Sequence, residues 1–163
     1  MSFKVFLSYS VDSEEQAIVW RLQTLAASHG IQIYVPQRQP LRMTSRQPAL
    51  LPDEAKNAID QADCVVAIIT SRTGPAVDKE LNYALGRQKV IIPIVQDTVA
   101  NAPVLKKFAT VFRFSPHDPP GKTETEVVNF LKQQRVSKEG LQIVGAVIAI
   151  GLGLLLLSSV PQE

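Results

Sequence analysis

The chain has 163 residues, of which 45% are hydrophobic and 20% are charged, and its formal net charge is +2. This length allows one domain with a proper core and a modest appendage. The near-neutral total argues against a nucleic-acid binder and against an acidic tail. The single cysteine, Cys64, cannot form an internal disulfide, and one thiol with two histidines makes a poor metal site, so we expect Cys64 to pack inertly and no metal to bind.

The first quarter of the chain predicts a strand, a helix and a second strand. Residues 4–8 ("KVFLS") are typical of a short buried strand. No apolar segment of a secretory signal precedes them. Ser13 and Gln16 have capping-box spacing and open a helix, which Gly30 ends, and residues 31–35 form the second strand. The apolar positions of this helix include Ala17, Trp20, Leu22 and Leu25.

A long loop follows at residues 36–52. It contains four prolines and three arginines (Arg38, Arg42 and Arg46) and no acidic residue. Long loops without secondary structure inside compact domains are often functional.

The rest of the first 140 residues alternates helices with apolar strands. We expect helices at 53–61, 75–86 and 123–136, a helical turn at 102–108, and strands at 64–69, 90–95 and 110–114. Continuous apolar strands between helices predict an α/β domain around a parallel sheet that is covered on both faces. About five strands with short connections favour the flavodoxin-like order 2-1-3-4-5.

Glu80, on the expected helix 75–86, has no local explanation. At 100° per residue, an apolar arc is formed by Val77, Leu81, Ala84 and Leu85. Glu80 lies about 40° outside the edge of this arc. No cation three or four residues away can pair with it, whereas Asp78 is explained by its place in the first helical turn. We therefore expect Glu80 to be a carboxylate at the surface edge of the helix.

Several polar residues follow the strands of the expected sheet. Tyr9, Ser10 and Asp12 follow the first strand, the arginine-rich loop follows the second, and Thr70 and Ser71 follow the third. In open α/β sheets the ligand crevice lies at the carboxyl ends of the strands. We expect Asp12 to cap the first helix and the other residues to line a cleft that Glu80 faces.

Residues 141–160 ("LQIVGAVIAIGLGLLLLSSV") contain no charge over 20 positions. As a helix they would measure about 30 Å, the thickness of the hydrocarbon core of a bilayer. Three cations precede this segment: Lys132, Arg135 and Lys138. The positive-inside rule then predicts a C-terminal, single-pass membrane anchor with residues 1–140 in the cytoplasm and 161–163 as a tail. Small residues at 145, 149 and 153 favour self-association of such spans.

"KVFLSYS" resembles the opening of a Toll/interleukin-1 receptor (TIR) domain. "DCVVAIITSRTGPAVDKELNYALGRQKVIIPIV" is similar to the third strand, third helix and fourth strand of that family, and the resemblance covers residues 3–134. It implies a TIR domain at 1–136, followed by a juxtamembrane linker at 137–140. In the prokaryotic NAD-cleaving type, the glutamate of the matching helix is the catalytic residue, and Glu80 occupies that position. Family members commonly carry tryptophan four residues earlier, where this chain has Ala76.

The resemblance therefore implies an enzyme that cleaves the nicotinamide–ribose bond of NAD, its substrate, without a cofactor. Glu80 would be catalytic, Arg38, Arg42 and Arg46 would bind the pyrophosphate, Tyr9 would stack on a ring, and Ser10 and Ser71 would hydrogen-bond ribose or amide groups. The resemblance also implies self-association of the domain and a role in immune, anti-phage defence. Two alternatives stay open: a non-catalytic TIR adaptor that signals through domain contacts, and a nucleoside deoxyribosyltransferase-like enzyme.

Overall fold

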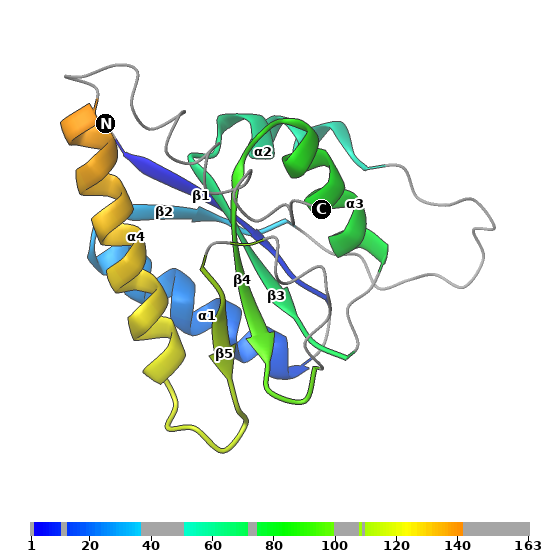
Figure 1. Cartoon of the computed structure of the whole chain (residues 1–163), viewed down its shortest axis with the longest axis vertical. Coiled ribbons are helices and arrows are strands. Elements are labelled where there is room, and N and C mark those ends of the chain that lie inside the picture. Colours follow the sequence, from blue (N-terminus) through cyan, green and yellow to red (C-terminus); the bar gives the residue numbers. More distant parts are fainter. Residues whose placement is uncertain are drawn as a thin grey trace, which may run out of the picture.

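The structure is a computed structural model that describes residues 2–10, 13–36, 51–71, 75–99, 108 and 110–141. Strands and helices alternate along the chain (Figure 1). Their bounds are β1 (Phe3–Ser8), α1 (Ser13–Ser28), β2 (Ile31–Tyr34), α2 (Asp53–Gln61), β3 (Cys64–Ile69), α3 (Pro75–Gly86), β4 (Val90–Gln96), β5 (Phe112–Phe114) and α4 (Lys122–Leu141).

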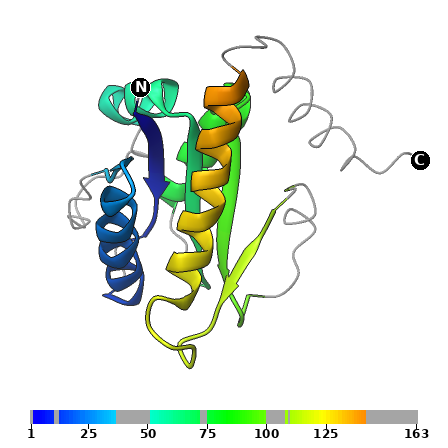
Figure 2. The ribbon, with the colours of Figure 1, turned by 90° about the vertical axis from the view of Figure 1, so that its left-hand side faces the viewer.

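All five strands form one parallel sheet in the order β2-β1-β3-β4-β5, as predicted. Helices α1 and α4 cover one face of this sheet, and α2 and α3 cover the other (Figures 1 and 2). Strand β3, in the centre of the sheet, is apolar throughout because helices cover both faces of the sheet.

The alternation of side chains along β1 divides the core into two layers. Val5 and Leu7 pack into the cluster under α1 and α4, while Phe6 packs into the cluster under α2 and α3. Successive strand residues point to opposite faces, so Ser8 lies on the same face as Phe6. The last residue of β1 therefore directs its hydroxyl toward the α2 and α3 layer.

Helix α1 ends where the sequence predicts and buries one face against the sheet and α4. Gly30 has a φ of +73°, the left-handed conformation that glycine adopts readily after a helix. The buried positions of α1 include Ile18, Leu22 and Ala26, whereas the side chain of Trp20 is 76% exposed. The helix therefore presents the 18/22/26 face to the sheet and to α4, and Trp20 lies outside this face.

Helix α4 continues through Leu141 rather than ending at 136, so residues 137–140 are helical, and their role as a juxtamembrane linker stays a prediction. The segment Ser137-Lys138-Glu139 contains no proline, and lysine and glutamate are good helix formers, so nothing stops the helix at 136. No helix in the described ranges is both long and apolar enough to cross a membrane. The predicted span 141–160 lies beyond the described residues except for Leu141, as does the predicted turn at 102–108 except for Phe108.

Candidate functional site

Glu80 and Ser8 meet at the carboxyl edge of the sheet. Both residues have 0% exposed surface, and Ser8 Oγ donates a hydrogen bond to Glu80 Oε2 at 2.5 Å. The expectation that Glu80 lies at the surface edge of its helix was therefore wrong. A carboxylate removed from water is costly unless hydrogen-bond donors hold it, and such groups mark functional sites more often than exposed ones do.

The error arose from the position assumed for the buried face of α3. Val77, Glu80 and Ala84 are all fully buried, and their i, i+3, i+7 spacing places them on one stripe of the helix. Leu85, at the far end of the expected arc, is 43% exposed. Tyr83, on the other side of Glu80, packs against the core, so the buried face extends from Tyr83 past Glu80 to Val77.

A second buried carboxylate lies on the opposite face of the sheet. Glu15, in the first turn of α1, has 0% exposed surface and accepts hydrogen bonds from Ser10 N at 2.6 Å and from Thr70 Oγ1 at 2.7 Å. This residue was not predicted from the sequence as part of the site. Its spacing from the buried Ile18 and Leu22, three and seven positions later, was the available signal.

Tyr34, at the end of β2, lies on the same face of the sheet as Ser8. Its ring stacks on Phe6 with a centroid distance of 5.7 Å, and its hydroxyl donates to Glu54 Oε1 at 2.8 Å. Burial, the hydrogen bond to Glu54 and the negative charges of Glu54 and Glu80 all raise the pKa of Tyr34. Tyr34 is therefore within electrostatic reach of Glu80, and its place near the site was not predicted from the sequence.

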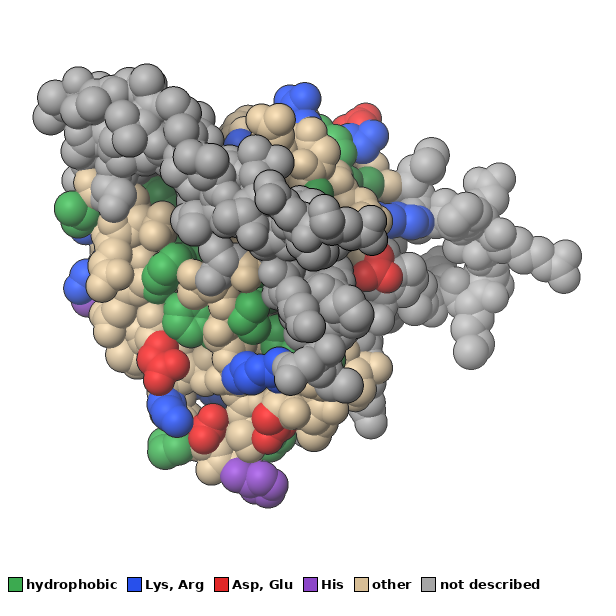
Figure 3. Space-filling model, in the orientation of Figure 1, with side chains coloured by type: hydrophobic (Ala, Val, Ile, Leu, Met, Phe, Trp, Pro, Cys, Tyr) green, Lys and Arg blue, Asp and Glu red, His purple; other side chains and the backbone are tan. Residues whose placement is uncertain are grey.

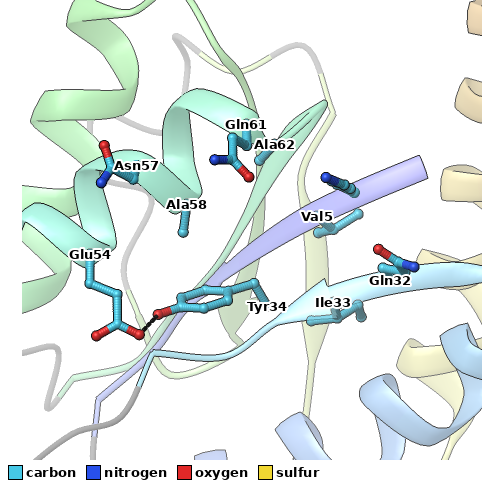
Figure 4. Close-up of a pocket in the computed structure, with 10 residues that line it drawn as sticks. Val5, Gln32, Ile33, Tyr34, Glu54, Asn57, Ala58, Gln61 and Ala62 are labelled. Atoms are coloured by element: carbon cyan, nitrogen blue, oxygen red, sulfur yellow. Dashed lines mark hydrogen bonds between the residues drawn. The ribbon is translucent and has the colours of Figure 1, made fainter. Parts of the chain in front are cut away.

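A cavity of about 410 Å³ opens between β2 and α2 (Figure 4). It exists because α2 packs its buried residues Ala55 and Ile59 over the inner strands and leaves one side of the edge strand β2 uncovered. Glu54, Asn57 and Gln61 of α2 border it on one side, and Tyr34 closes one end. Glu80 does not line this cavity. The site at Glu80 is therefore defined by its own contacts and not by this cavity.

The structure brings some of the predicted binding residues to this edge. Tyr9 is only 9% exposed and belongs to the core, with its hydroxyl 3.5 Å from the carbonyl oxygen of Pro36. The Ser10 N–H points to Glu15, and Ser71 is exposed after β3. Arg38, Arg42 and Arg46 lie outside the described residues, as does Asp12. The roles of these residues in substrate binding remain predictions.

Cys64 is buried in β3, and this burial raises the pKa of its thiol above the usual range. A thiol in this environment stays protonated and unreactive, in agreement with a packing role. Within the described ranges, no group of three or more His, Cys, Asp or Glu side chains is arranged to hold a metal ion. Where side chains are visible in Figure 3, acidic and basic residues are interspersed, as the net charge of +2 implies.

A parallel five-stranded sheet with the flavodoxin-like order, and a buried carboxylate at its carboxyl edge, define an α/β domain with a candidate site in the usual place for this class. The family model described as "TIR domain" matches residues 5–126, and the chain belongs to this family. No curated protein sequence matches the chain significantly.

Solved structures support the same fold. The RPS4 and RRS1 TIR domain heterodimer aligns with a TM-score of 0.59 at 14% identity, over 82% of this chain and 97% of that one. The CMP N-glycosidase BcmB of Clostridium botulinum aligns with a TM-score of 0.52 at 18% identity, over 80% and 98%. A diflavin flavoprotein A3 from Nostoc sp. aligns with a TM-score of 0.52 at 12% identity, over 85% and 99%. At these identities the likeness shows the fold alone.

Proposed function

We propose that this TIR domain cleaves the N-glycosidic bond between nicotinamide and ribose in NAD, with Glu80 as the catalytic residue. The observation that carries the proposal is the fully buried Glu80 carboxylate, held by Ser8 at the carboxyl edge of the sheet. Glu80 also occupies the family position of the catalytic glutamate. The structural neighbour named as a CMP N-glycosidase has the same fold and, by its name, acts on a bond of the same class.

A single carboxylate suffices for this chemistry. The bond from ribose C1′ to the pyridinium nitrogen breaks with its electron pair going to nitrogen, so nicotinamide leaves as a neutral molecule and needs no proton donor. Positive charge develops on C1′ and the ring oxygen, and the Glu80 carboxylate stabilises it electrostatically. Water then adds to C1′ and loses a proton, giving ADP-ribose. Capture of C1′ by another nucleophile would give a cyclic or base-exchanged product.

The burial of Glu80 affects both the access of the substrate and the strength of the electrostatic stabilisation. Glu80 has no exposed surface in this structure, so NAD reaches the carboxylate only when the groups covering it move aside. Expulsion of water around a charged group strengthens its interaction with a developing opposite charge. Burial therefore favours catalysis once the substrate has entered.

The test is product analysis by chromatography after incubation of the full-length protein with NAD. Glu80→Gln keeps the shape of the side chain and an acceptor for Ser8 but removes the charge, so we expect turnover to fall at least about hundredfold. Asp78→Asn is the matched control, because Asp78 is an exposed carboxylate on the same helix. Wild-type turnover in the Glu80→Gln protein would refute the assignment.

A non-catalytic adaptor is the second candidate. It is favoured by Ala76, where the family commonly has tryptophan. Protein that never consumes NAD, even when clustered on liposomes, would establish it. A third assay with CMP and other nucleosides covers the deoxyribosyltransferase-like alternative, which would turn over nucleosides and leave NAD intact.

We propose further that residues 141–160 anchor the domain in a membrane with the TIR domain on the cytoplasmic side, and that the protein acts in defence. The anchor rests on the 20 uncharged positions of this segment and on the cations before it. Confinement to a membrane would raise the local concentration of domains that self-associate. Release of the protein from membranes by carbonate washing would contradict the anchor.

A further inference from the structure

Glu15 connects two segments that leave the sheet at its carboxyl edge. One carboxylate oxygen accepts the Ser10 N–H at 2.6 Å, and the other accepts the Thr70 hydroxyl at 2.7 Å. Ser10 follows β1 and Thr70 follows β3. We call this arrangement the Glu15 bridge. The carboxylate is fully buried, and its place in the first turn of α1 lets the partial positive charge at the N-terminus of the helix stabilise it.

The Glu15 bridge begins where the pairing of the two strands ends. The last aligned pair of β1 and β3 is Ser8 with Ala67. The Glu15 bridge connects the two chains again two residues beyond Ser8 and three residues beyond Ala67. It therefore holds the backbone on the far side of Ser8, while the strand ladder holds the near side.

The same contact also joins the two strands on which the helix of Glu80 rests. Helix α3, which carries Glu80, packs against β1 and β3. The segments that leave both of these strands are hydrogen-bonded to one buried carboxylate on the opposite face of the sheet, and Ser8, the donor to Glu80, ends one of the strands. A donor and an acceptor on different elements keep a short hydrogen bond only if both elements are fixed.

We propose that Glu15 is a positioning residue, which sets the geometry of the Ser8–Glu80 hydrogen bond through Ser10 and Thr70. This inference rests on the proposed function of Glu80 where turnover is concerned, but the geometric effect can be measured without substrate. Glu15 itself is fully buried, and its replacement by alanine risks unfolding. Thr70→Val is the better variant, because it removes one hydroxyl and keeps the shape of the side chain.

The kinetic experiment compares Thr70→Val with Thr70→Ser in the full-length protein. Misplacement of a catalytic group by a fraction of an ångström to 1 Å lowers the rate of the chemical step, so we expect Thr70→Val to reduce kcat for NAD between about tenfold and hundredfold with KM little changed. Thr70→Ser keeps the hydroxyl and should restore kcat to near the wild-type value. A purely structural role for Thr70 would not separate kcat from KM in this way.

The second readout is the ¹³C resonance of the Glu80 carboxyl in protein labelled at glutamate, assigned by its loss in Glu80→Gln. Thr70→Val should shift this resonance and Thr70→Ser should not. Thr24→Val is the matched control, because the Thr24 hydroxyl also makes one hydrogen bond, to the Trp20 carbonyl at 2.9 Å, on the exposed side of α1. An unshifted resonance in Thr70→Val, or an equal shift in Thr24→Val, would overturn the positioning role. If the wild type cleaves no NAD, the proposed function fails and the resonance alone decides whether Glu15 positions Glu80.

Discussion

Two carboxylates at opposite ends of the α2 and α3 layer show how differently the same chemical group can be held. Glu80 lies at the carboxyl edge of the sheet, fully buried, with the hydroxyl of Ser8 as a donor. Asp60 lies at the other end, partly exposed to water. It accepts hydrogen bonds from Tyr83 Oη at 2.9 Å and from Arg87 Nε at 2.6 Å. Glu80 and Tyr83 belong to α3, and Arg87 is the residue that follows its end.

The electrostatics of the Asp60 end are those of an ordinary surface ion pair. Burial raises the pKa of Asp60, but the hydrogen bonds from Arg87 and Tyr83, with the charges of Arg87 and Lys89, outweigh this effect and lower it overall. Lys89 Nζ also donates to the carbonyl oxygens of Asp60 and Ala62. This cluster links α2, α3 and the start of β4, so its role is to hold elements together. Of these two carboxylates, Glu80 is the one whose burial indicates a functional role.

Removal of one hydroxyl from each end of the layer should give the largest difference in the free energy of unfolding. Ser8→Ala leaves a buried carboxylate with one donor fewer, and we expect the free energy of unfolding to fall by about 2 to 3 kcal/mol. Tyr83→Phe removes the corresponding donor to Asp60 at a site that water reaches, so its cost should be clearly smaller. Urea unfolding of the two variants measures both values.

Equal costs for Ser8→Ala and Tyr83→Phe would show that burial does not distinguish the two ends. Each variant removes only an oxygen atom and its proton, so neither creates a large void that would confuse the comparison. The m-values should match the wild type, because a changed m-value would report a different unfolded state rather than a lost hydrogen bond.

The second test removes the charge and keeps the shape. Glu80→Gln relieves the cost of a buried charge, so we expect stability to stay equal or to rise by up to about 1 kcal/mol, as often occurs when a functional site is neutralised. Asp60→Asn removes the attraction of Arg87 and should lower stability. We expect the two variants to change stability with opposite signs when thermal unfolding is measured at pH 7. A loss of stability in both variants would place Glu80 with Asp60 as a structural residue.

The fold could be predicted almost entirely because its signals are local. The segments at 53–61, 64–69 and 75–86 match the observed elements residue by residue, and the strand order follows from their alternation. The predicted end of α4 at residue 136 was wrong, because the sequence there has no signal that stops a helix. The exposure of Trp20 could not be predicted, because helix periodicity gives the relative angle of residues on a helix, but tertiary packing decides which side faces the sheet.

The candidate site was predictable only in part. Glu80 could be selected because no neighbour on its own helix explains it and because the family motif passes through it. Its donor could not be found, since Ser8 and Glu80 are 72 positions apart in the sequence and only the sheet brings them together. The same holds for the contact of Glu15 with Thr70, 55 positions apart, and for Tyr34 with Glu54 across the long loop. Contacts between distant polar residues leave no periodic trace in a sequence.

The smallest expected effect concerns the acid limb of the stability curve. The pKa of Asp60 is lower in the folded protein than in the unfolded chain, so the folded state binds the proton more weakly. The stability that Asp60 contributes is therefore complete above the ordinary aspartate pKa of about 4 and is lost as the pH falls through the lowered value. The difference in melting temperature between wild type and Asp60→Asn should be constant from about pH 5 to 7 and should shrink toward zero in stronger acid.

High salt should reduce the difference in melting temperature at neutral pH, because Arg87 and Asp60 are both reached by solvent ions. A difference that persists undiminished at about pH 2 would mean that the hydrogen bonds to Asp60, rather than its charge, stabilise this end of the layer.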